Sequence, residues 1–216
     1  MNLAILIILT VIGTFIGFIY ENYSKFKDKK AFTKANKKHI IYFLISGVFL
    51  IILDCVLDIR YSNRLIDNIR LLIMLIILVP VAAIDYKKKI IENKVILISL
   101  GIRVIMLIAE FILDSRQAVI NLKSMGLGFV LVLLMAIIGI FIIKNGFGMG
   151  DIKLMFIMIL YLGFASSFSA IFMSLVLSMI ASIYLLVKKE KSKKDTIPFA
   201  PFILLGTYVS VILTGM

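Results

Sequence analysis

Two aspartates in this chain have the type and the setting for acid–base chemistry. Asp151 ends the segment Gly-Met-Gly-Asp (148–151), a short polar break between long apolar runs, and Asp85 ends another apolar run shortly before three lysines (87–89). Two carboxylates that approach closely cannot both ionise easily, so one keeps its proton while the other draws a proton from water. Such a pair can hydrolyse an amide without a metal or a covalent intermediate. The two aspartates are therefore a candidate aspartic protease dyad.

The composition predicts that these residues are carried by membrane helices. Hydrophobic residues make up 62% of the chain, the mean hydropathy is +1.12, and apolar stretches recur along the whole length. A membrane interior of roughly 30 Å needs about 20 helical residues, and backbone groups in lipid must be paired within the segment. We therefore predict an all-α, polytopic membrane protein in which residues 1–216 form one integral-membrane domain, without a separate soluble module.

The apolar runs predict about eight transmembrane helices. The block from 152 to 187 is almost continuously apolar, and we divide it at 163–167 because one helix of that length would overshoot the bilayer. The predicted spans are 3–20, 39–57, 67–86, 95–113, 124–143, 152–163, 167–187 and 199–215.

The distribution of basic residues predicts the orientation of these helices. Four connections on one side carry 18 of the 24 basic residues. Those assigned to the opposite side are Arg60, Arg64, Arg70, Arg116 and Lys123. The positive-inside rule then puts the lysine-rich connections in the cytoplasm and both termini outside. The predicted counter-charge is membrane lipid and not nucleic acid, because the basic residues are divided among loops without interleaved aromatic side chains.

Other polar residues have simpler interpretations. Asp54, Arg103 and Glu110 lie within or near the ends of apolar spans, where interhelical pairing or snorkelling is favoured over catalysis. A small transporter could use these three as an ion relay, although no inverted repeat supports that alternative. Asp67 is assigned to a solvated outer connection. A single cysteine, Cys55, excludes an intramolecular disulfide and a cysteine zinc site.

The glycines before Asp151 also predict local structure. Gly146, Gly148 and Gly150 are expected to allow positive φ and a close approach of the backbone to another helix. The alternative role for Asp151 is an N-cap, since an aspartate before an apolar run can bond the free N–H groups of a new helix. The alternative for Asp85 is a plain charge at the membrane interface.

Three segments resemble those of prepilin peptidases, in the same order. Residues 84–93 (Ile-Asp-Tyr-Lys-Lys-Lys-Ile-Ile-Glu-Asn) resemble the first catalytic segment, in which an aspartate at a helix end precedes basic residues and Ile-Pro-Asn; Glu92 replaces the proline. Residues 148–154 (Gly-Met-Gly-Asp-Ile-Lys-Leu) are similar to the second, commonly Gly-x-Gly-Asp-Val-Lys-Leu. Residues 197–202 (Ile-Pro-Phe-Ala-Pro-Phe) are similar to Ile-Pro-Phe-Gly-Pro-Phe, with Ala200 in place of glycine.

This resemblance implies a bacterial type IV prepilin leader peptidase, a membrane aspartic protease of the Gly-x-Gly-Asp type. The implied substrate is a type IV prepilin or pseudopilin helix, whose short basic leader is cut after its glycine at the cytoplasmic face of the cell membrane. The implied catalytic residues are Asp85 and Asp151, and the implied supporting residues of the active-site loops are Gly148, Gly150, Lys153, Asn93, Pro198 and Pro201.

The departures from the family also carry expectations. Many bacterial members have paired Cys-x-x-Cys motifs after the first helix, associated with zinc and N-methylation, whereas residues 21–38 contain no cysteine. We therefore predict no metal and no cofactor. Presenilin-like and archaeal preflagellin peptidases share the Gly-x-Gly-Asp motif, but the segments around Asp85 and Pro198 favour the bacterial pilin branch. We expect the dyad to be loose at rest and to close on substrate.

Overall fold

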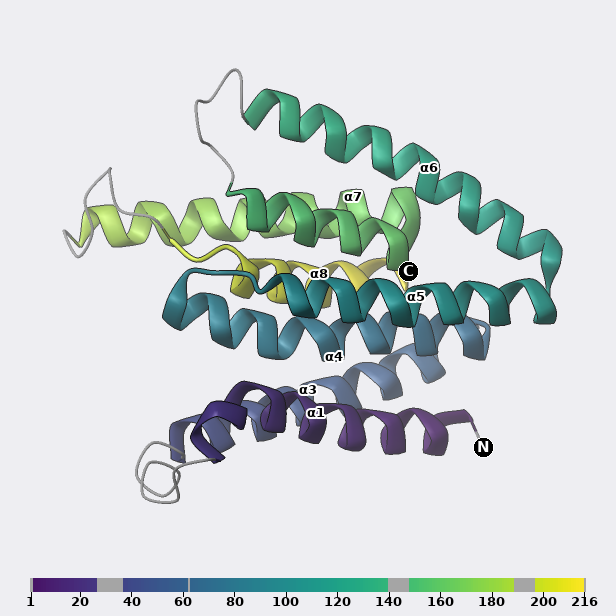
Figure 1. Ribbon diagram of the computed structural model, residues 1–216, viewed down its shortest axis with the longest axis horizontal. Coiled ribbons are helices and arrows are strands. Elements are labelled where there is room, and N and C mark those ends of the chain that lie inside the picture. The colour runs from purple at the N-terminus through teal and green to yellow at the C-terminus, as the bar shows by residue number, and fades with distance from the viewer. Residues whose placement is uncertain (1, 27–36, 62, 140–147, 189–196, 216) are drawn as a thin grey trace.

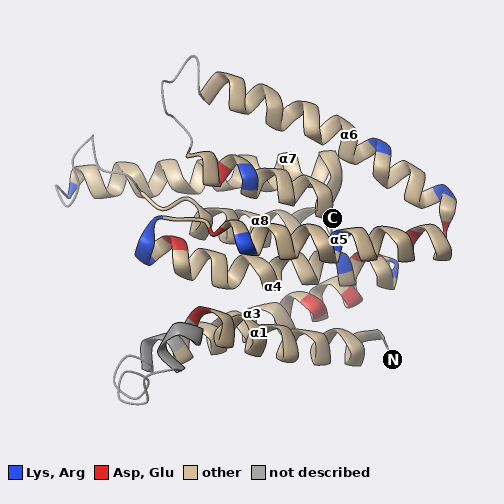
Figure 2. Cartoon of the chain, viewed as in Figure 1, with Lys and Arg blue, Asp and Glu red and all other residues tan. Residues whose placement is uncertain are grey.

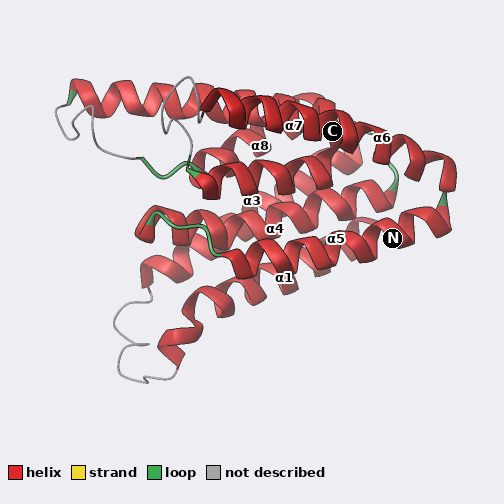
Figure 3. Cartoon of the chain, turned by 45° about the horizontal axis from the view of Figure 1, so that its top comes forward, coloured by secondary structure: helices red, strands yellow, loops and turns green. Residues whose placement is uncertain are grey.

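The computed structural model describes residues 2–26, 37–61, 63–139, 148–188 and 197–215. Every regular element in these ranges is helical (Figure 3). The prediction of an all-α protein is therefore confirmed. Most of the lysine-rich connections, and Gly146 with them, lie outside the described residues.

The described residues form seven helices. They are α1 (Asn2–Phe26), α3 (Lys37–Arg60), α4 (Leu65–Lys88), α5 (Asn93–Leu113), α6 (Ser115–Ile137), α7 (Met149–Val187) and α8 (Ala200–Thr214). The first six are long and apolar enough to cross a membrane, and α8 is a shorter apolar helix of 15 residues. This composition is that of a polytopic membrane protein.

Helix α4 is the centre of the bundle. The pair formed by α1 and α3 packs on one side of it, α5, α7 and α8 pack on the other, and α6 lies at the outer edge against α5 and α7 (Figure 1). Of the six long helices, α4 is the most buried. Its Leu71, Leu75 and Leu78 belong to one apolar core with Met158 of α7 and Ile203 of α8. The helix that carries Asp85 is thus held on several sides.

Two glycines let α1 approach α4 closely. A Cβ on Gly13 would lie 2.5 Å from Ile76 Cδ1, and one on Gly17 would lie 3.4 Å from the ring of Pro80 and 3.3 Å from Phe43. The spacing Gly-x-x-x-Gly is typical of membrane helices whose backbones touch. Helix α1 therefore packs closely against α4 because its two glycines leave room for Ile76 and Pro80.

Helix α7 is broken at Gly163, where φ is +74° and ψ is −168°. In a continuous helix the Phe164 N–H would donate to the Leu160 carbonyl. Here it donates to Ser124 Oγ at 2.8 Å, and the Leu160 carbonyl accepts from Arg103 Nε at 2.6 Å. The chain turns back at this point, so the two parts of α7 run in opposite directions (Figure 1). The predicted break between 163 and 167 is confirmed.

One predicted boundary differs clearly from the observed helix. Helix α6 begins at Ser115, nine residues before the predicted start at 124, because Asp114 caps it by accepting a 3.1 Å hydrogen bond from the Gln117 N–H. Arg116 and Lys123, which were assigned to a connection, lie on this helix instead.

The contact between α7 and α8 leads to a first prediction. A Cβ on Gly206 of α8 would lie 2.5 Å from the backbone nitrogen of Ser174 and 2.8 Å from its Cα. Because backbone cannot move aside cheaply, we expect Gly206→Ala to destabilise the fold by about 1–3 kcal/mol. Thermal unfolding of the purified protein in detergent measures this. Gly101→Ala is the matched control, since a Cβ there meets nothing within 4 Å. Equal unfolding temperatures for the two variants would contradict the close contact between Gly206 and Ser174.

Candidate active site

Asp85 is held between the end of α4 and the start of α8. Its side chain is 5% exposed, and its Oδ2 accepts a hydrogen bond of 2.9 Å from the Ala200 N–H, 115 residues further along the chain. Helix α4 ends at Lys88, and its C-cap Lys89 is the one described non-glycine residue with positive φ (54°); the Lys89 N–H donates to the Asp85 carbonyl at 2.8 Å. Asp85 therefore also caps the N-terminus of α8, where a negative charge is favoured.

Asp151 is held at the start of α7. It is half-buried, and its Oδ2 accepts a 3.2 Å hydrogen bond from the Gly148 N–H. Gly148 is the N-cap residue and Asp151 is the third residue of the helix, which is the carboxylate half of a capping box. The alternative that Asp151 is itself the N-cap is thus wrong by three positions, although its carboxylate does bond a free N–H at this helix end.

The glycines of this segment serve close approach and not unusual backbone angles. A Cβ on Gly150 would lie 3.2 Å from Ile91 Cβ, and one on Gly148 would lie 3.1 Å from Asp151 Oδ2. The prediction of positive φ is wrong at Gly148, where φ is −67°, and at Gly150, because the chain is already turning into α7. Among the described glycines, positive φ occurs at Gly163 and Gly215.

One cavity of about 670 Å³ brings the two aspartates together. The three motif segments line it, and they contribute Asp85, Lys89, Ile90, Ile91, Asn93, Gly148, Met149, Gly150, Asp151, Lys153, Ile197, Pro198 and Phe199. All but one of the predicted site residues lie in this set. The exception is Pro201, which lines a neighbouring apolar pocket of about 470 Å³ between α3, α4 and α8. The residues between the motif positions, such as Ile91 and Phe199, were not singled out, although their adjacency to the motifs was a usable signal.

A hydrogen bond spans the cavity rim between α5 and α7. Lys153 Nζ donates to Asn93 Oδ1 at 2.9 Å, and both side chains are exposed. Asn93 is the first residue of α5 and Lys153 lies two positions after Asp151, so the bond ties the segment that follows Asp85 to the segment around Asp151. A contact of this kind is what the role predicted for Asn93 and Lys153, support of the active-site loops, would require.

The charged groups on the cavity wall are two carboxylates and two lysines, Asp85, Asp151, Lys89 and Lys153. Metal sites are usually built from three or more His, Cys, Asp or Glu side chains. No such group gathers within the ranges that the structure describes. The two carboxylates that line the cavity can exchange protons with a water molecule that lies beside a bound peptide.

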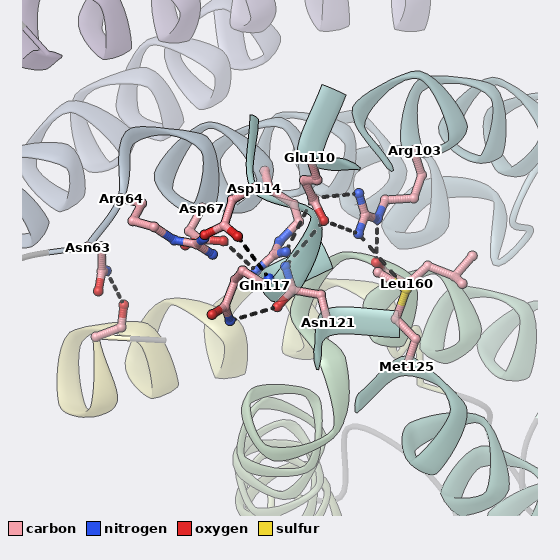
Figure 4. Close-up of polar contacts among 12 residues, drawn as sticks. Asn63, Arg64, Asp67, Arg103, Glu110, Asp114, Gln117, Asn121, Met125 and Leu160 are labelled. Atoms are coloured by element: carbon pink, nitrogen blue, oxygen red, sulfur yellow. Dashed lines mark hydrogen bonds and ion pairs between the residues drawn. The ribbon is translucent and has the colours of Figure 1, made fainter. Parts of the chain in front are cut away.

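A second polar cluster, the arginine–carboxylate network, lies near the start of α4 and the end of α5, and Figure 4 shows its contacts. Arg103 binds both oxygens of Glu110, at 2.8 and 3.3 Å, and Arg70 reaches Glu110 Oε1 at 3.3 Å. Arg70 also pairs with Asp67 at 3.1 Å. Arg103 and Glu110 both lie on α5, and each also contacts another helix, Glu110 through Arg70 of α4 and Arg103 through the Leu160 carbonyl of α7, so the predicted interhelical pairing is confirmed for both. The assignment of Arg70 and Asp67 to an exposed connection is wrong, because α4 begins before them and turns them inward.

Asp54 makes a separate contact. Its side chain is 1% exposed, and its Oδ2 accepts a 2.8 Å hydrogen bond from Thr10 Oγ1, which joins α3 to α1. The predicted interhelical pairing is therefore confirmed for Asp54 too. Asp54 and the Arg103–Glu110 pair thus have different partners on different helices, which does not favour their action as one relay.

The charged residues of the described helices gather mainly towards the two ends of the bundle, with apolar helix between them (Figure 2). The cavity is at one end, where α4 ends and α5, α7 and α8 begin. The arginine–carboxylate network is at the other end, near the start of α4 and the end of α5. From Asp67 to Asp85 the helical rise is roughly 27 Å, close to the thickness of a membrane interior.

Comparison with known proteins gives one match. The model of the type IV leader peptidase family matches residues 71–183, just over half of the chain. This stretch includes Asp85 and Asp151 and ends before Pro198. Neither a curated protein nor a solved structure matches the chain.

Proposed function

Because the chain belongs to the type IV leader peptidase family, we propose that it is a membrane aspartic endopeptidase that removes the short basic leader from type IV prepilins or pilin-like proteins. The observation that carries this proposal is the position of Asp85 and Asp151, which come from two different helices and line one cavity. Each carboxylate is bonded through Oδ2 to a backbone amide, so both are oriented before substrate binds.

The proposed chemistry uses the two carboxylates in different protonation states. The ionised aspartate takes a proton from a water molecule, which attacks the carbonyl carbon of the scissile peptide bond. The protonated aspartate donates to the carbonyl oxygen, and a proton then passes to the amide nitrogen as the bond breaks. The amides of Ala200 and Gly148 hold the carboxylates in place during these transfers.

We propose eight membrane crossings with the N-terminus outside. The break at Gly163 supports this number, because it lets α7 cross the membrane twice. The lysines at 87–89, together with Lys94, Lys153 and Lys188, are attached to the helix ends beside the cavity, and the positive-inside rule assigns such an end to the cytoplasm. The cavity would then meet a leader that projects from the cytoplasmic end of a substrate helix, and the lysines would contact anionic lipid.

The proposal is tested by co-expressing the chain with a tagged type IV prepilin and identifying the products by mass spectrometry. We expect a mature protein that begins directly after the leader glycine, and a released leader. Products cut inside the membrane span would instead favour a presenilin-like protease. No cleavage of several different prepilins, by protein shown to be folded and inserted, would contradict the proposed function.

A further inference from the structure

The loop that follows Asp85 is tethered to the first helix of the protein. This active-site loop comprises residues 89–92, and three of its residues, Lys89, Ile90 and Ile91, line the cavity. The Tyr20 hydroxyl on α1 donates a 2.7 Å hydrogen bond to Glu92 Oε2 at the end of the loop. On the other side of the loop, Glu21 pairs with Lys87 of α4. Two consecutive residues of α1 thus contact both flanks of the loop.

The anchor of this tether is fixed. Gly13 and Gly17 seat α1 directly against Ile76 and Pro80 of α4, and Tyr20 lies one turn further along the same helix. The tether therefore links the active-site loop, through α1, to α4, the helix that carries Asp85.

The loop in turn touches the segment of the second aspartate. Ile91 packs so closely on Gly150 that a Cβ at position 150 would lie 3.2 Å from the Ile91 Cβ. Displacement of the loop would change this contact and hence the position of Asp151 relative to Asp85. A hydrogen bond at Glu92 can therefore affect the relative position of the two aspartates without contacting the substrate.

We propose that Tyr20 is a positioning residue: its hydrogen bond to Glu92 holds the active-site loop between the two aspartate segments and so sets the rate of the cleavage proposed above, on which this inference rests. Glu92 is the N-cap residue of α5 but makes no side-chain cap with its own helix. Its carboxylate is directed to α1 instead.

The backbone at Glu92 offers a way to replace the tether. Its φ of −73° is within the range that proline fixes, and its amide donates no backbone hydrogen bond in the part of the chain that the structure describes. Glu92→Pro should therefore hold the loop by backbone rigidity alone, whereas Glu92→Ala removes the acceptor and adds no rigidity.

The test measures kcat/KM for prepilin cleavage by the purified full chain in lipid nanodiscs. We expect Tyr20→Phe and Glu92→Ala each to lose about tenfold, as for loss of a hydrogen bond to a charged group, and the double variant to lose no more than either one. Glu92→Pro should cleave faster than Glu92→Ala and be indifferent to Tyr20→Phe. Tyr61→Phe is the matched control, because it removes a hydroxyl that bonds the carbonyl of Ile212 towards the opposite end of α8.

A second measurement separates failure of this proposal from failure of the proposed function. Hydrogen exchange of residues 86–93 should be faster in Tyr20→Phe than in wild type or Tyr61→Phe, while the unfolding temperature stays the same. If wild type does not cleave prepilins but exchange rises, the tether stands and the proposed substrate is wrong. Wild-type cleavage with an unchanged rate and unchanged exchange in Tyr20→Phe would overturn the positioning role, and so would a loss in Tyr20→Phe that persists beside Glu92→Pro.

Discussion

Asp85→Asn and Asp151→Asn are each expected to lower the rate of prepilin cleavage by at least about 10³-fold, within the range for loss of general acid or base catalysis. Asparagine matches aspartate in shape, and its side-chain oxygen can still accept the hydrogen bond from Ala200 or Gly148. It cannot exchange a proton with water or substrate. The fold should therefore survive while the chemistry is lost, which single-turnover cleavage assays in membranes can measure.

The control for these variants is the same substitution at an aspartate outside the cavity. Asp58 is exposed on α3 and contributes nothing to the cavity wall, so Asp58→Asn should cleave at the wild-type rate. Equal unfolding temperatures for all three variants would show that the loss is chemical. Cleavage within tenfold of wild type by either cavity variant would remove that aspartate from the proposed dyad.

The sequence predicted the helical class and the two aspartate segments for different reasons. Helices follow from composition, because a chain so apolar must pair its backbone groups internally. The segments at 84–93 and 148–154 were found by resemblance, and the cavity contains nearly all of the residues that this resemblance named. The break of α7 was predictable from length, since 39 apolar residues exceed one membrane span.

Contacts between distant residues were not predictable in the same way. The hydrogen bond from Arg103 to the Leu160 carbonyl and that from Phe164 to Ser124 depend on which faces α5 and α6 turn towards α7. A uniformly apolar helix has little polar pattern to mark its inner face. The bond between Tyr20 and Glu92 was missed as well, because the replacement of proline by Glu92 was visible in the sequence but nothing there linked it to a tyrosine of the first helix.

The error at Arg70 has a related physical cause. Charges near a predicted helix end were assigned to water, but α4 begins at Leu65 and Arg70 on its second turn pairs with Glu110 of α5. There Arg70 and Arg103 share Glu110, and Asn121 of α6 donates to the same carboxylate at 3.2 Å. The buried charges of this cluster depend on one another, because removing one partner leaves an uncompensated charge in the protein interior.

Glu110→Gln is for this reason expected to destabilise the protein by about 3–5 kcal/mol, the usual result of removing one partner from a buried ion pair. Glu110 is 3% exposed, and its two oxygens accept from Arg70, Arg103 and Asn121. Glutamine offers one accepting oxygen and turns an NH₂ group towards these donors. Two buried guanidinium groups would then share no negative charge at this position. Thermal unfolding in detergent measures the loss.

Asp114→Asn is the matched control, taken from the exposed edge of the same network. Asp114 is 51% exposed and pairs with Arg64 at 3.2 Å, and exposed pairs contribute little, so we expect a change within about 1 kcal/mol. Asparagine can also keep the cap on α6. Equal stabilities of Glu110→Gln and Asp114→Asn would contradict a structural role for the buried charge.

The substitution at Glu110 should also affect the break in α7, because Arg103 holds the Leu160 carbonyl beside Gly163. We expect the turn between the two parts of α7 to loosen first. Hydrogen exchange around residues 160–164 should therefore rise before that of α4.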